Sequence, residues 1–277
     1  MNTATGEERC FRRETTAAHI RQVVAHAKVE ASAQGGQVVW IMESTTGWAR
    51  VKELLGDQAE FILANVLQMP LPPKAHRRKT DKIDTGRMQR EYLNGTLPRS
   101  YQPSARLRQV RRLVDTRQDI TERQTTLRSW IWQYLKHETW QSAKNLWSGR
   151  GMARLKAMAL PELDRLTMTL KLTELEQLDA LLAQVEAELM KINRQWPEAQ
   201  RLDEIRGIGA ITAVTILAYI GPIDRFKTAE ELISYAGLAP GVHRSDGTCY
   251  NKRIGGGGTH ARLTDKPRTC RRGLQSP

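Results

Sequence analysis

The sequence has few cysteines and no long apolar run. Its three cysteines, Cys10, Cys249 and Cys270, lie far apart and outside any C-x-x-C pattern. This odd, scattered set predicts neither a disulfide framework nor a zinc site, and favours reduced thiols in a cytoplasm. No apolar stretch approaches the ~20 residues that a membrane span needs. Because residues 1–13 also lack the apolar core and cleavage site of a signal peptide, we expect a soluble cytoplasmic protein with no membrane partner.

Acidic residues are scarce relative to basic ones. The 277 residues include 43 Lys and Arg against 30 Asp and Glu, a formal net charge of +13. The excess is spread along the chain instead of being confined to one tail. Such a charge is typical of proteins that bind nucleic acid, and it predicts an affinity that falls steeply with salt.

Strands and helices are expected to alternate in the first hundred residues. The expected elements are a possible short strand at 8–13, a helix at 17–33 capped by Thr16, a strand at 37–42, a helix at 48–55, a strand at 60–67 and a helix from Asp81. The two later strand segments are continuous apolar runs, which favours buried strands. This order is typical of an α/β domain.

Three acids stand where such a domain gathers chemical groups. Glu43 follows the strand at 37–42, and the carboxyl ends of strands are where α/β sites form. Asp81 and Asp84 are three residues apart, so they share one helix face. Magnesium prefers carboxylate oxygens, which would explain the acid pair. A solvated helix start with Asp as a capping residue is the alternative, which these residues alone favour.

The middle of the chain is expected to be helical. A helix over 104–134 carries a row of arginines, among them Arg108 and Arg112, which would either track a phosphate backbone or form a solvated basic face. Leucines and other apolar residues at heptad spacing over 175–196 predict a seam, either within an antiparallel hairpin or in a dimer. Four tryptophans lie between these segments, and we interpret them as core or partner contacts: Trp130, Trp132, Trp140 and Trp147.

A glycine turn interrupts the apolar pattern of residues 201–220. Gly207 and Gly209 flank Ile208, with apolar residues at helical spacing on both sides. The pattern resembles a helix-hairpin-helix, whose exposed amides at the start of the second helix bind DNA phosphates without reading sequence. A purely structural turn remains the alternative.

Two segments resemble one family of transposases. They are Glu43 with S-T-T-G-W-A together with K-T-D-K-I-D at 79–84, and the stretch 226–258, which contains H-R-S-D-G and four consecutive glycines. They are similar to the DEDD transposases of the insertion-sequence one-ten (IS110) and eleven-eleven (IS1111) group. The resemblance implies a DNA transposase with an α/β plus α fold. Its parts would be a ribonuclease-H-like (RuvC-like) domain at 1–100, a helical or coiled-coil hairpin at 101–197, and a helical domain with the helix-hairpin-helix at 198–263.

The resemblance also implies site residues and partners. Glu43, Asp81 and Asp84 would bind Mg²⁺, and Ser245 would attack a DNA phosphate and form a covalent serine–DNA intermediate. The expected DNA-binding residues are Gly207, Gly209, Arg108, Arg112, Arg244, Lys252 and Arg253. The expected partners are the DNA of the element and its target, an element-encoded guide RNA and further copies of the chain, in a bacterial cytoplasm and associated with the nucleoid.

Both ends depart from the family pattern. The first of the four family acids has no counterpart, because no Asp precedes Asp57. We therefore expect the opening strand to be missing, and residues 264–277 to be a disordered basic tail left by truncation or a change of reading frame. A catalytically inactive remnant that only binds DNA or RNA is the alternative function. A repair accessory with a helix-hairpin-helix is a third, but it explains neither K-T-D-K-I-D nor the segment around Ser245.

Overall fold

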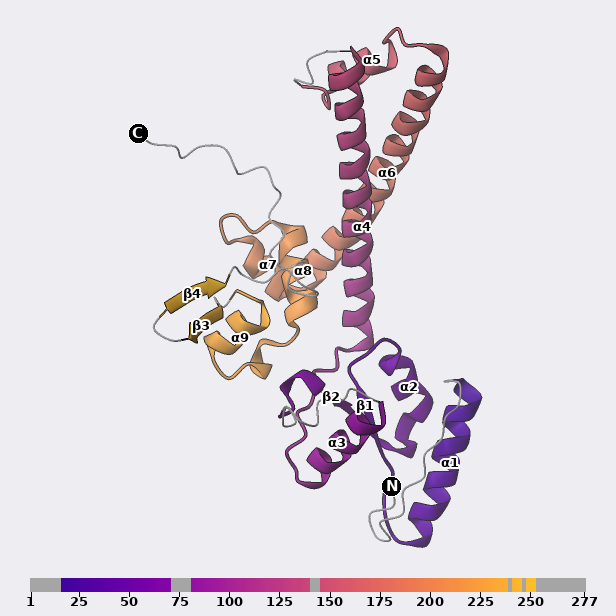
Figure 1. Ribbon diagram of the computed structural model, residues 1–277, viewed down its shortest axis with the longest axis vertical. Coiled ribbons are helices and arrows are strands. Elements are labelled where there is room, and N and C mark those ends of the chain that lie inside the picture. Colours follow the sequence, from indigo (N-terminus) through magenta and orange to yellow (C-terminus); the bar gives the residue numbers. More distant parts are fainter. Residues whose placement is uncertain (1–15, 71–80, 140–144, 239–240, 246–247, 253–277) are drawn as a thin grey trace. The chain divides into compact units, whose positions relative to one another are not determined.

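The computed structural model describes residues 16–70, 81–139, 145–238, 241–245 and 248–252 (Figure 1). For residues 81–84, 138–139, 241–245 and 248–252 it describes the backbone alone. The chain forms two compact units, residues 1–102 and 103–277. The predicted strand at 8–13, Trp140, Arg253 and the predicted basic tail all lie outside the described residues.

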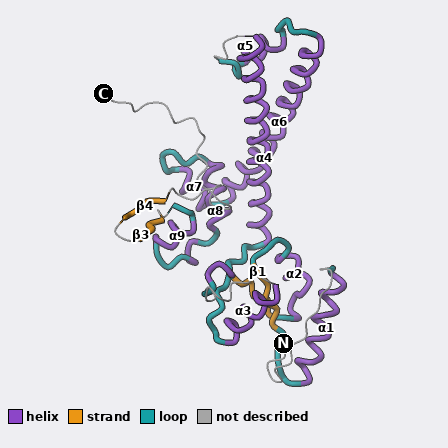
Figure 2. The backbone as a smooth tube through the Cα atoms, in the orientation of Figure 1, coloured by secondary structure: helices purple, strands orange, loops and turns teal. Residues whose placement is uncertain are grey.

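The first unit combines three helices with a small parallel sheet in its described part (Figures 1 and 2). Its elements are α1 (Ala17–Ala33), β1 (Val39–Glu43), α2 (Trp48–Leu55), β2 (Glu60–Ala64) and α3 (Asp81–Leu93), with 3-10 turns at Gly56–Gln58 and Val66–Gln68. β1 and β2 pair in parallel, with Val39 opposite Glu60 and Glu43 opposite Ala64. On its other edge β2 forms an antiparallel bridge between Ala64 and Arg99.

The core of the first unit lies between α1 and α2. The hydroxyl of Thr16 accepts a hydrogen bond from the His19 amide (3.3 Å), which confirms the predicted cap of α1. Ile20 and Val24 then pack with Val51 and Leu55 of α2. Val23, the residue before Val24, is 37% exposed. One residue turns a helix by 100°, so only Val24 of this pair faces α2.

The predicted strands are correct in kind but wrong in extent. β1 begins two residues later than predicted and is half-buried, not fully buried. β2 ends at Ala64 because Asn65 leaves the extended conformation (φ −95°, ψ 85°) and a 3-10 turn follows. Leu67, predicted within the strand, is 98% exposed. An apolar run therefore identified each strand without showing where it stops.

The second unit is largely helical. Its elements are α4 (Ala105–Tyr134), a π-helical turn (Leu135–Thr139), α5 (Gly149–Lys156), α6 (Glu162–Gln195), α7 (Pro197–Asp203), α8 (Ala210–Ile220), a 3-10 turn (Ile223–Arg225), α9 (Ala229–Tyr235), β3 (Gly241–Ser245) and β4 (Thr248–Lys252). Together with the first unit this agrees with the predicted combination of α/β and α structure. Within the described ranges, no helix has both the length and the apolar character needed to cross a membrane.

Helices α4 and α6 form an antiparallel hairpin (Figure 1). The start of α4 packs on the end of α6, where Val110 shares a core with Leu189 and Ile192. Further along, Leu127 of α4 packs with Leu175 of α6. The heptad seam predicted over 175–196 thus faces α4 of the same chain, and the antiparallel hairpin is confirmed.

Polar pairs fix the register of this hairpin. Arg117 forms an ion pair with Glu186 (2.7 Å). The buried Gln124 donates to Asp179 (2.6 Å), which also accepts from Arg128 (3.3 Å). A buried amide that loses its partner costs about 1–3 kcal/mol, so a slipped register is disfavoured.

Candidate nucleic-acid interface

The three predicted metal-binding acids belong to β1 and α3. Glu43 is the last residue of β1, at the carboxyl end of the strand as predicted, and it is exposed. Asp81 and Asp84 lie in the first turn of α3, at a spacing that places them on one face. Their side chains are outside the described part, but carboxylates are suitable donors for Mg²⁺. Among the side chains that the structure describes, no three possible metal ligands come together.

The glycine turn predicted at 207–209 connects α7 with α8. Gly207 has a positive φ of +96°, a conformation that a residue with a Cβ adopts only under strain. Gly209 is extended (φ −90°, ψ 168°) and precedes α8 with no side chain capping it. Both glycines are exposed. The predicted turn between two helices is therefore confirmed, and no side chain caps the start of α8.

The first turn of α8 presents backbone donors that the helix itself cannot satisfy. The first N–H groups of any helix lack an intrahelical acceptor, and the helix dipole adds a partial positive charge there. The buried Asn193 of α6 donates to the carbonyl of Ala210 (3.4 Å) and holds this end of α8. Arg201 and Arg206, which the sequence analysis did not single out, are exposed on α7 and in the turn. Their nearness to Gly207 in the sequence was a usable signal.

The arginines of α4 divide into structural and exposed residues. Arg112, a predicted DNA-binding residue, is exposed, and no side-chain partner is found for it among the described residues. Arg108, the other predicted one, is half-buried and donates to the Pro103 carbonyl (3.0 Å). Arg117 and Arg128 form the ion pairs of the hairpin. The predicted row of arginines is therefore not one continuous phosphate-binding face.

Arg111 fastens α4 to the end of α8. Its guanidinium donates to the carbonyls of Ala218 (2.6 Å) and Tyr219 (3.0 Å) and lies 5.5 Å from the centre of the Tyr219 ring. The Tyr219 hydroxyl in turn donates to Asp115 of α4. A positive charge at the carboxyl end of a helix interacts favourably with the partial negative charge of the helix dipole there. This contact therefore stabilises α8 as well as attaching it to α4.

Arg225 performs a similar role after α8. It donates to the Ile220 carbonyl (2.8 Å), and its guanidinium lies 4.1 Å from the ring centres of Phe226 and Tyr235. The Tyr235 hydroxyl donates to the Tyr219 carbonyl (3.1 Å), which links α9 to α8. Sequence analysis missed this cluster, whose members lie within residues 219–235 and meet only in the fold.

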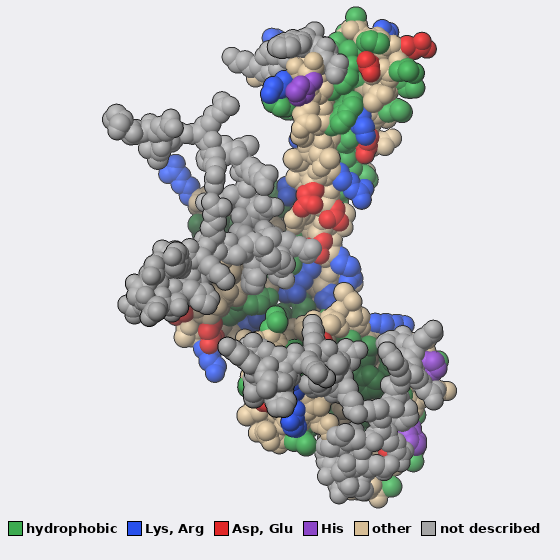
Figure 3. Space-filling view, in the orientation of Figure 1, with side chains coloured by type: hydrophobic (Ala, Val, Ile, Leu, Met, Phe, Trp, Pro, Cys, Tyr) green, Lys and Arg blue, Asp and Glu red, His purple; other side chains and the backbone are tan. Residues whose placement is uncertain are grey.

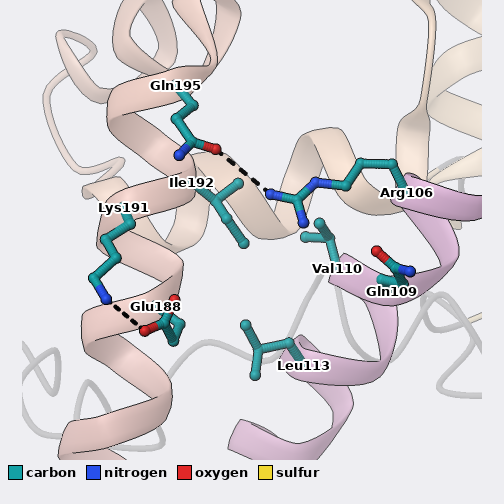
Figure 4. A pocket seen from close by; sticks show the side chains of 8 residues that line it. All are labelled: Arg106, Gln109, Val110, Leu113, Glu188, Lys191, Ile192 and Gln195. Carbon is teal, nitrogen blue, oxygen red and sulfur yellow. Dashed lines mark hydrogen bonds and ion pairs between the residues drawn. The ribbon is translucent and has the colours of Figure 1, made fainter.

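A shallow groove of about 260 Å³ lies between the start of α4 and the end of α6 (Figure 4). Its floor is apolar, formed by Val110, Leu113 and Ile192. On its rim, Arg106 contacts Gln195 (3.5 Å) and Lys191 contacts Glu188 (2.6 Å). Since both cations already have protein partners, we do not assign the groove to phosphate binding.

Ser245 is the last residue of β3 in an antiparallel hairpin. β3 pairs with β4 so that Ser245 is opposite Thr248 and Arg244 is opposite Cys249. Lys252, the last residue of β4, is opposite Gly241. The predicted nucleophile is thus the last residue of β3, directly before residues 246–247, which lie outside the described residues. The distance between this hairpin and the acids of the first unit is not defined, because the two belong to different units.

Comparison with known proteins identifies the relatives of this chain. Residues 199–263 match the family model described as "Transposase IS116/IS110/IS902 family". The "Transposase for insertion sequence element IS1111A" of Coxiella burnetii is 33% identical over 73 residues, which cover 26% of this chain and 20% of that protein. The "Putative transposase y4pF/y4sB" of Sinorhizobium fredii is 24% identical over 208 residues, covering 72% of this chain and 51% of that protein.

The longer match covers 72% of this chain, but each match covers only part of the relative. The chain spans about a fifth and about half of the lengths of the two curated relatives. The family match contains both the glycine turn and the hairpin with Ser245. The family match over residues 199–263 and the two curated relatives together support an IS110/IS1111-family transposase.

Proposed function

We propose that this chain binds DNA and cleaves and rejoins its strands during transposition of an insertion sequence. The observation that carries the proposal is the content of the family match at 199–263. One segment holds an open helix start flanked by exposed arginines and a β-hairpin that ends its first strand at Ser245. The first feature suits a DNA phosphate, and the second suits a nucleophile at the end of a strand.

DNA is held at the turn between α7 and α8 in this proposal. The amides at the start of α8 hydrogen-bond a phosphate, while Arg201 and Arg206 add charge from the neighbouring backbone. Arg112 on α4, with Arg244, Lys252 and Arg253 in the hairpin region, contacts further phosphates. None of these groups reads base edges, so this part of the interface positions DNA without selecting its sequence.

Ser245 attacks the phosphate in the chemical step. Its oxygen forms a bond to phosphorus while a bond from phosphorus to a deoxyribose oxygen breaks, and that oxygen takes a proton. Serine needs a base or strong stabilisation of the phosphate to react. His243, Arg244 and Lys252 are near Ser245 in the sequence and supply candidate groups for both roles.

The acids of the first unit form the second half of the reaction centre. Glu43, Asp81 and Asp84 hold magnesium, which when bound supplies positive charge to a reacting phosphate. The first unit is then the described part of a ribonuclease-H-like domain. An element-encoded guide RNA and further copies of the chain complete the proposed assembly, which brings the acids and Ser245 to one DNA strand.

Binding and chemistry are separated by variants in a salt titration. The affinity of the chain for a labelled 30-base-pair duplex is measured between 50 and 300 mM KCl. Arg201→Ala and Arg206→Ala should each lower the slope of log affinity against log salt by about 0.9, the effect of one lost phosphate contact. Ser245→Ala and Asp84→Ala should leave affinity and slope nearly unchanged.

Lys191→Ala is the control for lost charge. It removes one positive charge as well, but from a lysine already paired with Glu188. An equal loss of slope in Lys191→Ala would show that net charge alone explains the binding. A large loss in Ser245→Ala would contradict the assignment of that residue to chemistry.

A further inference from the structure

Two tryptophans at the end of the α4–α6 hairpin are exposed. Trp130 fulfils the core interpretation, since it packs into the local core and stacks on Tyr134 with ring centres 5.6 Å apart. Trp132 and Trp147 are instead 42% and 40% exposed. Tryptophan is the largest side chain, and leaving so much of it in water is unfavourable. A ligand that covers these rings would therefore gain free energy.

Each exposed ring has a cation above it. The Lys136 ammonium is 5.2 Å from the centre of the Trp132 ring, and the Arg128 guanidinium is 5.7 Å from that of Trp147. Arg128, Trp132 and Lys136 are four residues apart, so they follow one another along one side of α4 and the π-helical turn. Cations and aromatic rings thus alternate along this side.

The same end of the hairpin concentrates positive charge. Residues 123–156 contain seven Lys or Arg residues and one acid, Glu138. Arg150 and Arg154 of α5 are exposed there. Figure 3 shows blue and purple side chains on one side where the long helices end, and red ones on the other side. We define the hairpin-end patch as the following residues: Arg128, Trp132, Lys136, Trp147, Arg150 and Arg154.

This composition distinguishes nucleic acid from a protein partner. Exposed leucines also occur on α6, at Leu163, Leu166 and Leu170, but that stripe contains no aromatic residue. Aromatic rings interleaved with cations match a strand whose bases stack while its phosphates are neutralised. In a duplex the base faces are already stacked on one another, so flat rings bind unpaired bases better.

We propose that the hairpin-end patch binds unpaired nucleotides of a single-stranded nucleic acid. Bases stack on Trp132 and Trp147, and Lys136 and Arg150 contact the flanking phosphates, while Arg128 stays paired with Asp179. This contact goes beyond the DNA-binding turn between α7 and α8, which we assign to duplex phosphates. RNA and DNA share the chemistry of the proposal, and the experiment separates them.

The test measures binding of the full chain to single strands and to duplex. The probes are labelled U20 RNA, dT20 DNA and a 20-base-pair duplex in 100 mM KCl. Trp132→Leu and Trp147→Leu should each weaken single-strand binding by about fivefold or more, which corresponds to one lost stacking contact. Trp132→Phe and Trp147→Phe should retain most of it, and duplex affinity should stay within twofold in all four variants.

Three further measurements keep the test independent of folding. Lys136→Gln changes an exposed side chain and should lower the salt slope for single strands by about 0.7. Leu163→Ala with Leu166→Ala is the matched control, because it trims exposed apolar side chains of the same hairpin. Circular dichroism melting establishes that each variant is folded.

The outcomes divide clearly. A loss confined to single strands supports the proposal, and a larger loss with U20 or with dT20 identifies which strand is bound. Equal losses of affinity for duplex and single strands would overturn the proposal. So would unchanged single-strand binding in Trp132→Leu and Trp147→Leu. A defect of the Arg201 and Arg206 variants in duplex binding is a separate result, so failure of one proposal does not imply failure of the other.

Discussion

Arg111 and Arg112 are adjacent on α4, but we expect their replacement to affect different properties. The Arg111 variant should lose stability, and the Arg112 variant should lose DNA binding. Arg111→Met keeps the aliphatic part of the side chain but removes two hydrogen bonds to the end of α8. Hydrogen bonds from a charged group contribute about 1.5–3 kcal/mol each, and Arg111 is half-buried. We expect a loss of about 2–4 kcal/mol in the stability of the α4–α8 contact.

Hydrogen exchange measures this loss where it arises. A decrease of about 2–4 kcal/mol corresponds to roughly 30-fold to several-hundred-fold faster exchange of the peptides covering 105–115 and 210–220. Arg112→Met should leave the same peptides unchanged, because an exposed substitution without lost contacts alters stability by about 0.5 kcal/mol or less. Its effect should appear in DNA binding, as a salt slope lower by about 0.9.

The comparison is decisive because the two variants have the same composition and charge. If Arg111→Met exchanges like the unmodified chain, the contact between Arg111 and α8 does not stabilise the fold. If Arg112→Met instead loosens α8, the assignment of the two residues is reversed.

Three further variants test other parts of the fold. Leu189→Ala, at a fully buried position, should cost about 2–5 kcal/mol in chemical denaturation, and a cost below about 1 kcal/mol would show that the core around Val110 is not as described. Gly207→Ala should destabilise the turn by about 1 kcal/mol or more, since the φ of Gly207 is +96°. The same variant should weaken duplex binding, and unchanged duplex affinity would show that the turn does not contact DNA. Glu230→Gln should reduce stability only above the pKa of Glu230. Hydrogen bonds from its own amide and from Thr228 lower that pKa, so the stabilisation is present at neutral pH and is lost as pH falls through the lowered value. The variant and the unmodified chain should therefore differ in melting temperature at pH 7 but not at acidic pH. The same melting temperature for both proteins at pH 7 would contradict this expectation.

Local signals predicted local structure well. Thr16 caps its helix as predicted, because a hydroxyl before an apolar helix pattern satisfies an open amide. Ser104, predicted as the first residue of its helix, is the cap of α4 instead. The helix at 48–55 has the predicted bounds. The heptad spacing identified the face of α6 that packs on α4, since periodicity reports which side of a helix is buried.

Contacts between distant segments were beyond the reach of the sequence. Arg111 and Arg112 look alike in a row of basic residues, and only the position of α8 makes one structural and the other exposed. Trp130 and Trp132 differ in the same way, because a helix turns 200° over two residues. The turn at Gly207 was predictable because glycine is the residue that readily adopts a positive φ. No comparable sequence pattern indicates that Arg225 packs on its aromatic neighbours.

The central claim is that Ser245 breaks a DNA strand by forming a covalent bond to it. The direct measurement incubates the full chain with a supercoiled plasmid carrying the element junction, its RNA and magnesium, and looks for a protein–DNA adduct that survives denaturation. The account predicts an adduct that forms with the unmodified chain and disappears in Ser245→Ala, while both proteins bind DNA equally. Absence of the adduct with intact DNA binding, under conditions where a full-length relative reacts, would contradict the claim and leave a protein that binds DNA without cutting it.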